Sequence, residues 1–300
     1  MNTKSLFLSA SAVLFGFSVA QAQINLGERA LGAVQKGITG FTITDADAAA
    51  LSKAAVDKMD TENKVAEPTD PYAIRLARVF GKYTKGDTYT LNYKVYLTKD
   101  VNAFATADGS VRVFSGLMDI MDDNELIAVI GHEIGHVNNH DSRDAMKAAY
   151  KKEALIDAAA SQSNKVAAVT DSQLGKIGSA IIDCKFSRKQ ESEADLFAYE
   201  FMKKNGYDVN AEESAFRTLA KMSQSAESSF IDQMMSSHPD SNLRADTAKA
   251  RAEKDGLYKA YMKKPIINGA LPVAKKTTTT KTTTKATTTK TATKTTTTKK

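Results

Sequence analysis

The sequence contains one cysteine, no tryptophan and only four histidines in its 300 residues. A single cysteine, Cys184, cannot form an internal disulfide or a metal site built from several thiolates. Beyond the first 22 residues, no segment approaches the roughly 18 consecutive apolar residues of a membrane-spanning helix. The fold must therefore rest on an ordinary apolar core, for which a hydrophobic fraction of 42% is sufficient.

Positive charge is scarce in the part of the chain that can fold. The formal net charge is +6, but the eight lysines of residues 275–300 and Lys4 account for nine positive charges, which leaves residues 23–274 with a net charge of −3. A nucleic-acid-binding domain usually gathers Lys and Arg on one folded face. We therefore expect no nucleic-acid partner.

The N-terminal end has the pattern of a secretory signal peptide. Lys4 gives a basic start, residues 6–20 form an apolar run, and Ala20-Gln21-Ala22 has the small-residue form of a cleavage site. A membrane anchor is the alternative, but this run would be about 22 Å long as a helix, against about 30 Å for a bilayer core. We predict that residues 1–22 are removed and that the mature chain is periplasmic or extracellular.

The C-terminal end cannot belong to a core. Residues 275–300 consist of 16 Thr, 8 Lys and 2 Ala, and Pro265 and Pro272 precede them. Residues 265–300 are therefore predicted to be a disordered Thr/Lys-rich tail. The lysines either are simply solvated or give a weak association with anionic surfaces.

Between these ends, helical patterns predominate, and the predicted fold class is α+β and mainly helical. Residues 23–69 are expected to form an N-terminal helical segment, and residues 70–264 the main domain. Apolar residues at helical spacing predict five helical stretches: 46–59, 71–83, 122–139, 145–182 and 188–204. Short apolar runs, the last two flanking Asp108-Gly109, predict a small sheet from three strands: 89–97, 102–106 and 111–114.

The strongest chemical signal is the run His132-Glu133-Ile134-Gly135-His136 within the predicted helix 122–139. Residues four apart lie one turn apart on the same helix face, so His132 and His136 can both reach one zinc ion. Glu133 lies beside them, where a carboxylate can accept the proton of an activated water molecule. The run therefore predicts a zinc site with a general base.

A catalytic zinc site needs a third protein ligand and an open fourth position. His140 cannot supply it on a continuous helix, because it would lie about 12 Å along the axis from His132. In the predicted helix 188–204, Glu191 and Asp195 share one face and Glu193 points away. Glu191 would complete a His₂Glu site for one Zn²⁺ per chain, and Asp195 would orient a ligand imidazole. Taken alone, Glu191 could equally be a solvated surface charge.

These residues together resemble metallopeptidase family forty-eight, the group of HtpX and the CaaX prenyl endopeptidases. The resemblance covers roughly residues 70–250 and rests on an ordered set of motifs: Asn102-Ala103-Phe104-Ala105, Ser115-Gly116-Leu117, His132 to Val137, Ser187 to Glu191 with Ala194-Asp195, Gly206-Tyr207-Asp208, and His238-Pro239-Asp240 with Arg244. It implies a zincin-like (gluzincin) fold for residues 70–264, with Glu191 as the third zinc ligand. Transmembrane helices of the HtpX and prenyl-protease branches are missing here, so the chain resembles the soluble branch of periplasmic quality-control proteases.

A peptidase of this kind acts on unfolded or extended polypeptides. Asn102, Ala103, Phe104 and Ala105 resemble the family's strand beside the cleft, to which a substrate can add as a further strand. An ordinary interior strand is the alternative. A non-catalytic metal-stabilised or chaperone-like module is the alternative function, although a closed structural zinc site would have no use for Glu133.

The segment from His238 to Arg244 is predicted to assist catalysis. Three ligands already complete a His₂Glu site, so His238 is expected to act without binding the metal, by donating a hydrogen bond to the developing oxyanion. Pro239 favours an extended conformation for His238, which suits a loop at the rim of the cleft. Arg244 could hold this loop through Asp195 or Asp240. The alternative for His238 is a surface residue that caps a nearby helix.

Overall fold

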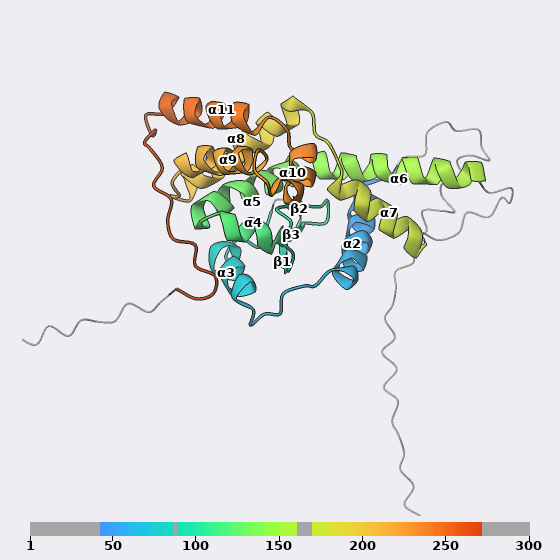
Figure 1. The fold of residues 1–300 in the computed structure, drawn as a ribbon. Coiled ribbons are helices and arrows are strands. Elements are labelled where there is room, and N and C mark those ends of the chain that lie inside the picture. Colours follow the sequence, from blue (N-terminus) through green and yellow to red (C-terminus); the bar gives the residue numbers. More distant parts are fainter. Residues whose placement is uncertain (1–42, 87–88, 161–169, 272–300) are drawn as a thin grey trace, which may run out of the picture. The chain divides into compact units, whose positions relative to one another are not determined.

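The computed structural model of the chain describes residues 43–86, 89–160 and 170–271 (Figure 1). Its elements in chain order are α2 (Asp45–Glu62), α3 (Pro71–Phe80), β1 (Asn92–Tyr96), β2 (Ala103–Ala105), β3 (Ser110–Phe114), α4 (Ser115–Ile120), α5 (Asp123–Asn138), α6 (Asp141–Ala160), α7 (Asp171–Ile182), α8 (Arg188–Lys204), α9 (Asn210–Met222), the 3₁₀ turn η1 (Ser228–Phe230), α10 (Asp232–Ser237) and α11 (Ser241–Lys254). The predicted signal peptide, 1–22, and the tail beyond 271 lie outside the described residues.

The three strands form one mixed sheet in the order β1-β3-β2. β3 runs parallel to β1 and antiparallel to β2, so Val113 lies opposite both Val95 and Ala103. Gly109, with φ of 86°, allows the turn between β2 and β3. The predicted mainly helical α+β fold with a small sheet is confirmed, and β2 is an edge strand.

The long helix α5 lies between the sheet and α8 (Figure 1), and its residues from Asn124 to Val137 are buried. Its apolar side chains join those of the sheet, α3 and α9 in the largest core. A capping box defines its start, because the Asp122 carboxylate accepts the backbone N–H of Glu125 at 3.0 Å and the Glu125 carboxylate accepts that of Asp122 at 2.9 Å. The core and this cap together fix the position of the helix that carries the histidine pair.

Helix α2 belongs to the same packed structure. It shares a second apolar core with α6 and α7, formed by Ile43, Ala48, Leu51, Ala55, Met146, Tyr150 and Ile177. Asp60 near its end pairs with Arg112 of β3 and Lys94 of β1, each at 2.7 Å. Burial alone would raise the pKa of Asp60, but Arg112, Lys94 and Tyr96 lower it to about 2, so the carboxylate remains charged. These contacts attach α2 to the sheet, and residues 23–42 of the predicted N-terminal segment lie outside the described residues.

Two sequence-based boundaries differ from the structure. The stretch 145–182 is divided into α6 and α7, with α6 beginning already at Asp141, and residues 161–169 lie outside the described part. The predicted tail begins too early, because Gly269 donates its N–H to the Pro71 carbonyl at 2.7 Å and Asn268 accepts from Arg75 at 3.1 Å. Arg75 is fully buried, and its charged donors need acceptors that α3 alone does not supply.

None of the helices in residues 43–86, 89–160 and 170–271 has both the length and the apolar character needed to cross a membrane.

Candidate active site

Two glycines of α5 allow α8 to approach closely. A Cβ added to Gly135 would lie 3.0 Å from the Cα and the carbonyl oxygen of Ala194, and one added to Gly131 would lie 3.4 Å from the Cα of Ala198. Larger side chains at these positions would hold the two helices apart. The close approach brings the histidine face of α5 against the face of α8 that carries Glu191 and Asp195.

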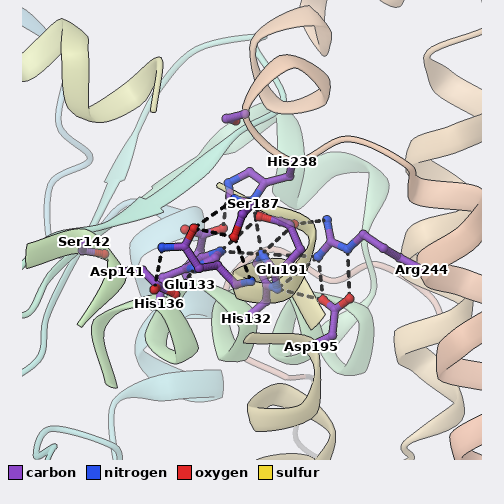
Figure 2. Close-up of polar contacts among 12 residues, drawn as sticks. His132, Glu133, His136, Asp141, Ser142, Ser187, Glu191, Asp195, His238 and Arg244 are labelled. Carbon is purple, nitrogen blue, oxygen red and sulfur yellow. Dashed lines mark hydrogen bonds and ion pairs between the residues drawn. The ribbon is translucent and has the colours of Figure 1, made fainter. Parts of the chain in front are cut away.

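Four buried side chains point toward one another at this contact, as Figure 2 shows: His132, His136, Glu191 and His238. One ligand atom of each lies within 4.8 Å of the other three. The Nε2 atoms of His132 and His136 are 3.1 Å apart, and Nδ1 of His238 lies 3.2 Å from Nε2 of His132. Oε1 of Glu191 is 3.4 Å from Nε2 of His136 and 3.0 Å from Nδ1 of His238. The structure thus brings together the three predicted ligands.

Each histidine of α5 has a carboxylate at its other ring nitrogen. Nδ1 of His132 is 2.8 Å from Oδ1 of Asp195, and Nδ1 of His136 is 2.9 Å from Oδ2 of Asp141. In a neutral imidazole, a carboxylate at this position accepts the Nδ1–H, an assignment that follows from the geometry. The lone pairs of both Nε2 atoms therefore point into the cluster.

This donor set fits a zinc ion. Ligands at about 2.0–2.1 Å from a tetrahedral zinc are about 3.3 Å apart. Neighbouring donor atoms of the cluster are separated by 3.0–3.6 Å. Converging lone pairs beside a buried carboxylate repel one another unless a positive charge lies between them. Imidazole nitrogen and carboxylate oxygen are both ligands that zinc accepts.

The surrounding charges favour a cation at the same place. Burial and the Arg244 guanidinium lower the pKa of His132 to about 3, so this imidazole is neutral and able to bind a metal. Burial opposes a proton on His136, but Asp141 and Glu191 raise its pKa to about 9. Burial alone would raise the pKa of Glu191, yet His136 and His238 hold it well below its usual range. The cluster therefore contains an ionised carboxylate and stabilises positive charge.

Arg244 of α11 links Glu191 and Asp195 of α8. Its Nε and Nη2 donate to the two oxygens of Asp195 at 3.0 and 2.6 Å, and its Nη1 lies 2.9 Å from Oε2 of Glu191. The sequence predicted a contact with Asp195 or Asp240, and the structure has the one with Asp195. Because Arg244 touches both carboxylates, it fixes their orientation relative to His132.

Glu133 lies beside the cluster and is 3% exposed. Among the described residues, its Oε1 has no hydrogen-bond partner, and Nε2 of His238 lies 3.6 Å from it. Burial raises the pKa of Glu133. A buried carboxylate with a raised pKa and a free oxygen has the properties of a general base.

His238 lies in a different environment from the expected one. Its backbone has left the helical conformation, with φ of −124° and ψ of 76°, and the following Pro239 disfavours a helical residue here. The residue is only 6% exposed, so the expectation of a rim position is corrected to a buried one. Because its Nδ1 lies among the ligand atoms, His238 is also a candidate fourth ligand. Its predicted role in catalysis without metal binding stays a prediction.

A cavity adjoins the cluster and is lined by the predicted substrate strand. Asn102–Ala105 form part of its wall, together with Glu133 and His238. Another part of the wall consists of Ile181 and Ile182 at the end of α7, together with Phe186, which follows that helix. The strand therefore lies next to the candidate general base.

The backbone of β2 has an edge that faces away from β3. Hydrogen bonds at both ends of the pair show that the carbonyl of Asn102 and the N–H of Thr106 face β3. By the alternation of an antiparallel pair, Ala103 and Ala105 direct their backbone groups the other way. Asn102 Oδ1 already accepts the N–H of Ala103, and Ser142 Oγ already donates to the carbonyl of Ala105, both at 2.9 Å. This edge is therefore partly occupied by the protein's own side chains.

Sequence reasoning missed two neighbours of His136. Asp141 contacts its Nδ1, and Phe186 stacks on its ring with a centroid distance of 3.8 Å and an interplanar angle of 15°. The only sequence signal for Asp141 is that it is an acid shortly after the histidine pair. This signal is informative only if α5 is known to end at Asn138. Phe186 gave no signal, because its contact joins segments 50 residues apart.

Known proteins resemble this chain over the region that contains the candidate site. Residues 75–252 match the sequence profile of peptidase family M48. The chain is 40% identical over 225 residues to metalloprotease YcaL of Escherichia coli (strain K12), which covers 73% of this chain and 86% of YcaL. It is 39% identical over 220 residues to metalloprotease LoiP of the same strain, covering 72% of this chain and 85% of LoiP. A putative beta-barrel assembly-enhancing protease of Vibrio cholerae serotype O1 is 33% identical over 132 residues, 41% of this chain and 27% of that protein.

Proposed function

The chain belongs to peptidase family M48 and is a metalloendopeptidase, and from this premise we propose that it is an exported, zinc-dependent enzyme that hydrolyses extended polypeptides. The observation that carries the proposal is the convergence of His132, His136 and Glu191 on one point beside Glu133. In this proposal these three residues hold one zinc ion per chain in a gluzincin-type His₂Glu site. Asp195 and Arg244 keep His132 and Glu191 in position.

The proposed place of action is the cell envelope. A relative named as a beta-barrel assembly-enhancing protease supports a role in envelope protein quality control. The predicted signal peptide, residues 1–22, supports export to the periplasm or the medium. The Lys-rich residues 275–300 would add at most a weak attraction to anionic surfaces.

The proposed mechanism assigns the proton transfers to Glu133. A bound zinc ion would polarise a peptide carbonyl and lower the pKa of a water molecule to about 7. Glu133 accepts the proton of the attacking water and passes it to the leaving amine. His132 keeps its Nε2 toward the centre because Asp195 holds the opposite nitrogen.

We place the substrate along the edge of β2. An extended peptide there pairs its main chain with Ala103 and Ala105, which gives affinity with little dependence on sequence. In the structure, Phe186 and the residues that end α7 line this space, and the Ser142 hydroxyl donates a hydrogen bond to the Ala105 carbonyl. Binding of a peptide therefore exchanges the Ser142 hydrogen bond for one from the substrate.

Removal of the metal tests the proposed zinc dependence. Incubation of the purified protein with a zinc chelator should abolish hydrolysis of unfolded casein, and one equivalent of Zn²⁺ per chain should restore it. The measurement is the appearance of casein fragments, paired with zinc content by mass spectrometry. Full hydrolysis by protein that is free of metal would refute the proposed chemistry.

His238 is proposed to donate a hydrogen bond to the oxyanion, and His238→Ala should therefore keep zinc while turnover falls by about 10²–10³. His132, His136 and Glu191 remain as three ligands in this variant. The measurement is casein turnover together with zinc content.

His140→Asn is the matched control, because His140 is exposed, lies outside the cluster and has a left-handed φ of 67° that Asn tolerates. It should behave as the wild type. A rise in the turnover of His238→Ala would instead mean that His238 occupies the position needed by water. Loss of zinc would mean that it is a required ligand.

A further inference from the structure

Asp141 is a buried acid that neither the proposed reaction nor the family motifs account for. It is the first residue of α6, and its side chain is 9% exposed. Its two oxygens have different partners, since Oδ2 lies 2.9 Å from Nδ1 of His136 and Oδ1 accepts the Nε2 amide hydrogen of Gln190 at 2.8 Å. Figure 2 shows Asp141 beside His136 on the opposite side of the cluster from Asp195 and Arg244.

The chain reaches this position through a strained residue. At the end of helix α5, the backbone N–H of Asn139 donates to the Gly135 carbonyl and that of His140 donates to the Val137 carbonyl. His140 then has φ of 67°, a left-handed conformation that costs free energy in any residue with a side chain. This single residue turns the chain so that α6 starts at once and Asp141 faces back toward His136. A less abrupt turn would carry the carboxylate away from the imidazole.

The two ligand histidines are held by unlike partners. The carboxylate at His132 is Asp195, whose charge is matched by a two-point contact with Arg244. The carboxylate at His136 is Asp141, whose partner Gln190 is a neutral amide. Asp141 therefore keeps more of its negative charge for the imidazole, which makes the ring a better electron donor at Nε2.

We propose that Asp141, held by Gln190, is a positioning residue that fixes the tautomer of His136 and presents its Nε2 to the metal. This inference rests on the proposed zinc site. Gln190 belongs to the same turn of α8 as Glu191, so one turn both supplies the third ligand and holds the carboxylate that orients the second. The metal site is thereby tied to the junction of α5 and α6.

A purely structural role for Asp141 is the competing explanation, because an acid in the first turn of a helix stabilises that helix. Asp144 provides the control, since it is a second acid in the first turn of α6 but is 62% exposed and pairs with Arg143. Asp141→Asn and Asp144→Asn remove the same charge from the same helix end. Only the first of them affects the partner of His136.

The test compares the zinc affinity of the full chain with Asp141→Ala, Asp141→Asn and Asp144→Asn, by competition with a chromophoric chelator. Asp141→Ala should weaken zinc binding about 10–100-fold. Asp141→Asn retains an oxygen acceptor and should lose less, and Asp144→Asn should match the wild type. The visible spectrum of the Co²⁺-substituted protein should change in the Asp141 variants alone, because it reports the ligand field of the metal.

Unchanged zinc affinity and an unchanged Co²⁺ spectrum in Asp141→Ala would overturn the inference. So would a fall in the melting temperature of the metal-free protein that is equal in the Asp141→Asn and Asp144→Asn variants, with zinc affinity intact. If Asp141→Ala does not fold, Asp141→Asn decides by the same two readouts. Failure of the wild type to bind zinc would refute the proposed function itself, which separates the two results.

Discussion

Replacement of Glu133 by Gln should lower casein hydrolysis by about 10²–10⁴ while the zinc content stays at the wild-type level. Gln has nearly the same volume as Glu, so the packing of the buried side chain is preserved, but it cannot accept the proton of the attacking water. Glu133 is not among the four side chains that converge on the proposed metal position. The loss should therefore appear in turnover and not in metal binding.

This variant also separates the enzyme from a metal-stabilised module without activity. An enzyme gives zinc in both proteins and hydrolysis in the wild type alone. Glu193→Gln is a suitable control, because Glu193 lies on the same α8 as Glu191 but its side chain is 50% exposed and pairs with Lys189. Hydrolysis by Glu133→Gln within a few-fold of the wild type would show that another group acts as the base.

Replacement of Glu191 by Ala should reduce zinc affinity by more than the roughly 10–100-fold that follows the loss of a hydrogen-bond partner of a ligand. Glu191 supplies the carboxylate of the cluster, with Oε1 at 3.4 Å from His136 Nε2 and Oε2 at 3.6 Å from His132 Nε2. Without it, the imidazoles of His132, His136 and His238 remain beside the Arg244 guanidinium. That arrangement repels a cation.

The matched variant is Glu193→Ala, which removes an exposed acid from the same helix and should leave zinc binding unchanged. Competition with a chromophoric chelator measures both. Because Arg244 loses one of its two carboxylate partners in Glu191→Ala, Glu191→Gln is the second variant and keeps the volume of the side chain. Equal zinc affinity in wild type and both Glu191 variants would remove Glu191 from the ligand set.

Local spacing made much of the site predictable from the sequence. His132 and His136 are four residues apart on one helix, as are Glu191 and Asp195 on another, so each pair shares a face whatever the rest of the fold does. Because a catalytic zinc site needs a third protein ligand, these two pairs predict that the two helices face each other. The structure places Nδ1 of His132 at 2.8 Å from Asp195, the partner that this reasoning chose.

The parts that were not predicted depend on turns and on contacts between distant segments. His140 was judged as if α5 continued, whereas the helix ends at Asn138 and a left-handed residue directs Asp141 back to the site. Residues other than glycine adopt this conformation uncommonly, and the enrichment of Asn, Asp and His there is too weak to predict it at one position. The burial of His238 depends on how α10 packs, which its own short sequence does not encode.

The C-terminal end of the folded part also depends on contacts between distant segments. Pro265 and the Lys-rich residues that follow predicted the exit from the core, but residues 267–269 bind Arg75, Arg78 and Pro71. Arg75 is fully buried, and Asn268 supplies one of its acceptors beside Asp123 and the carbonyls of Met118 and Met121. The local composition of residues 265–271 therefore does not predict these contacts.

The central claim is that His132, His136 and Glu191 hold a zinc ion beside Glu133. Anomalous diffraction from crystals of the wild-type protein grown with zinc, recorded on both sides of the zinc absorption edge, tests it most directly. We expect one peak per chain within about 2.0–2.2 Å of Nε2 of both histidines and of a Glu191 oxygen. The absence of a peak in this cluster, or a peak bound only by other residues, would contradict the account.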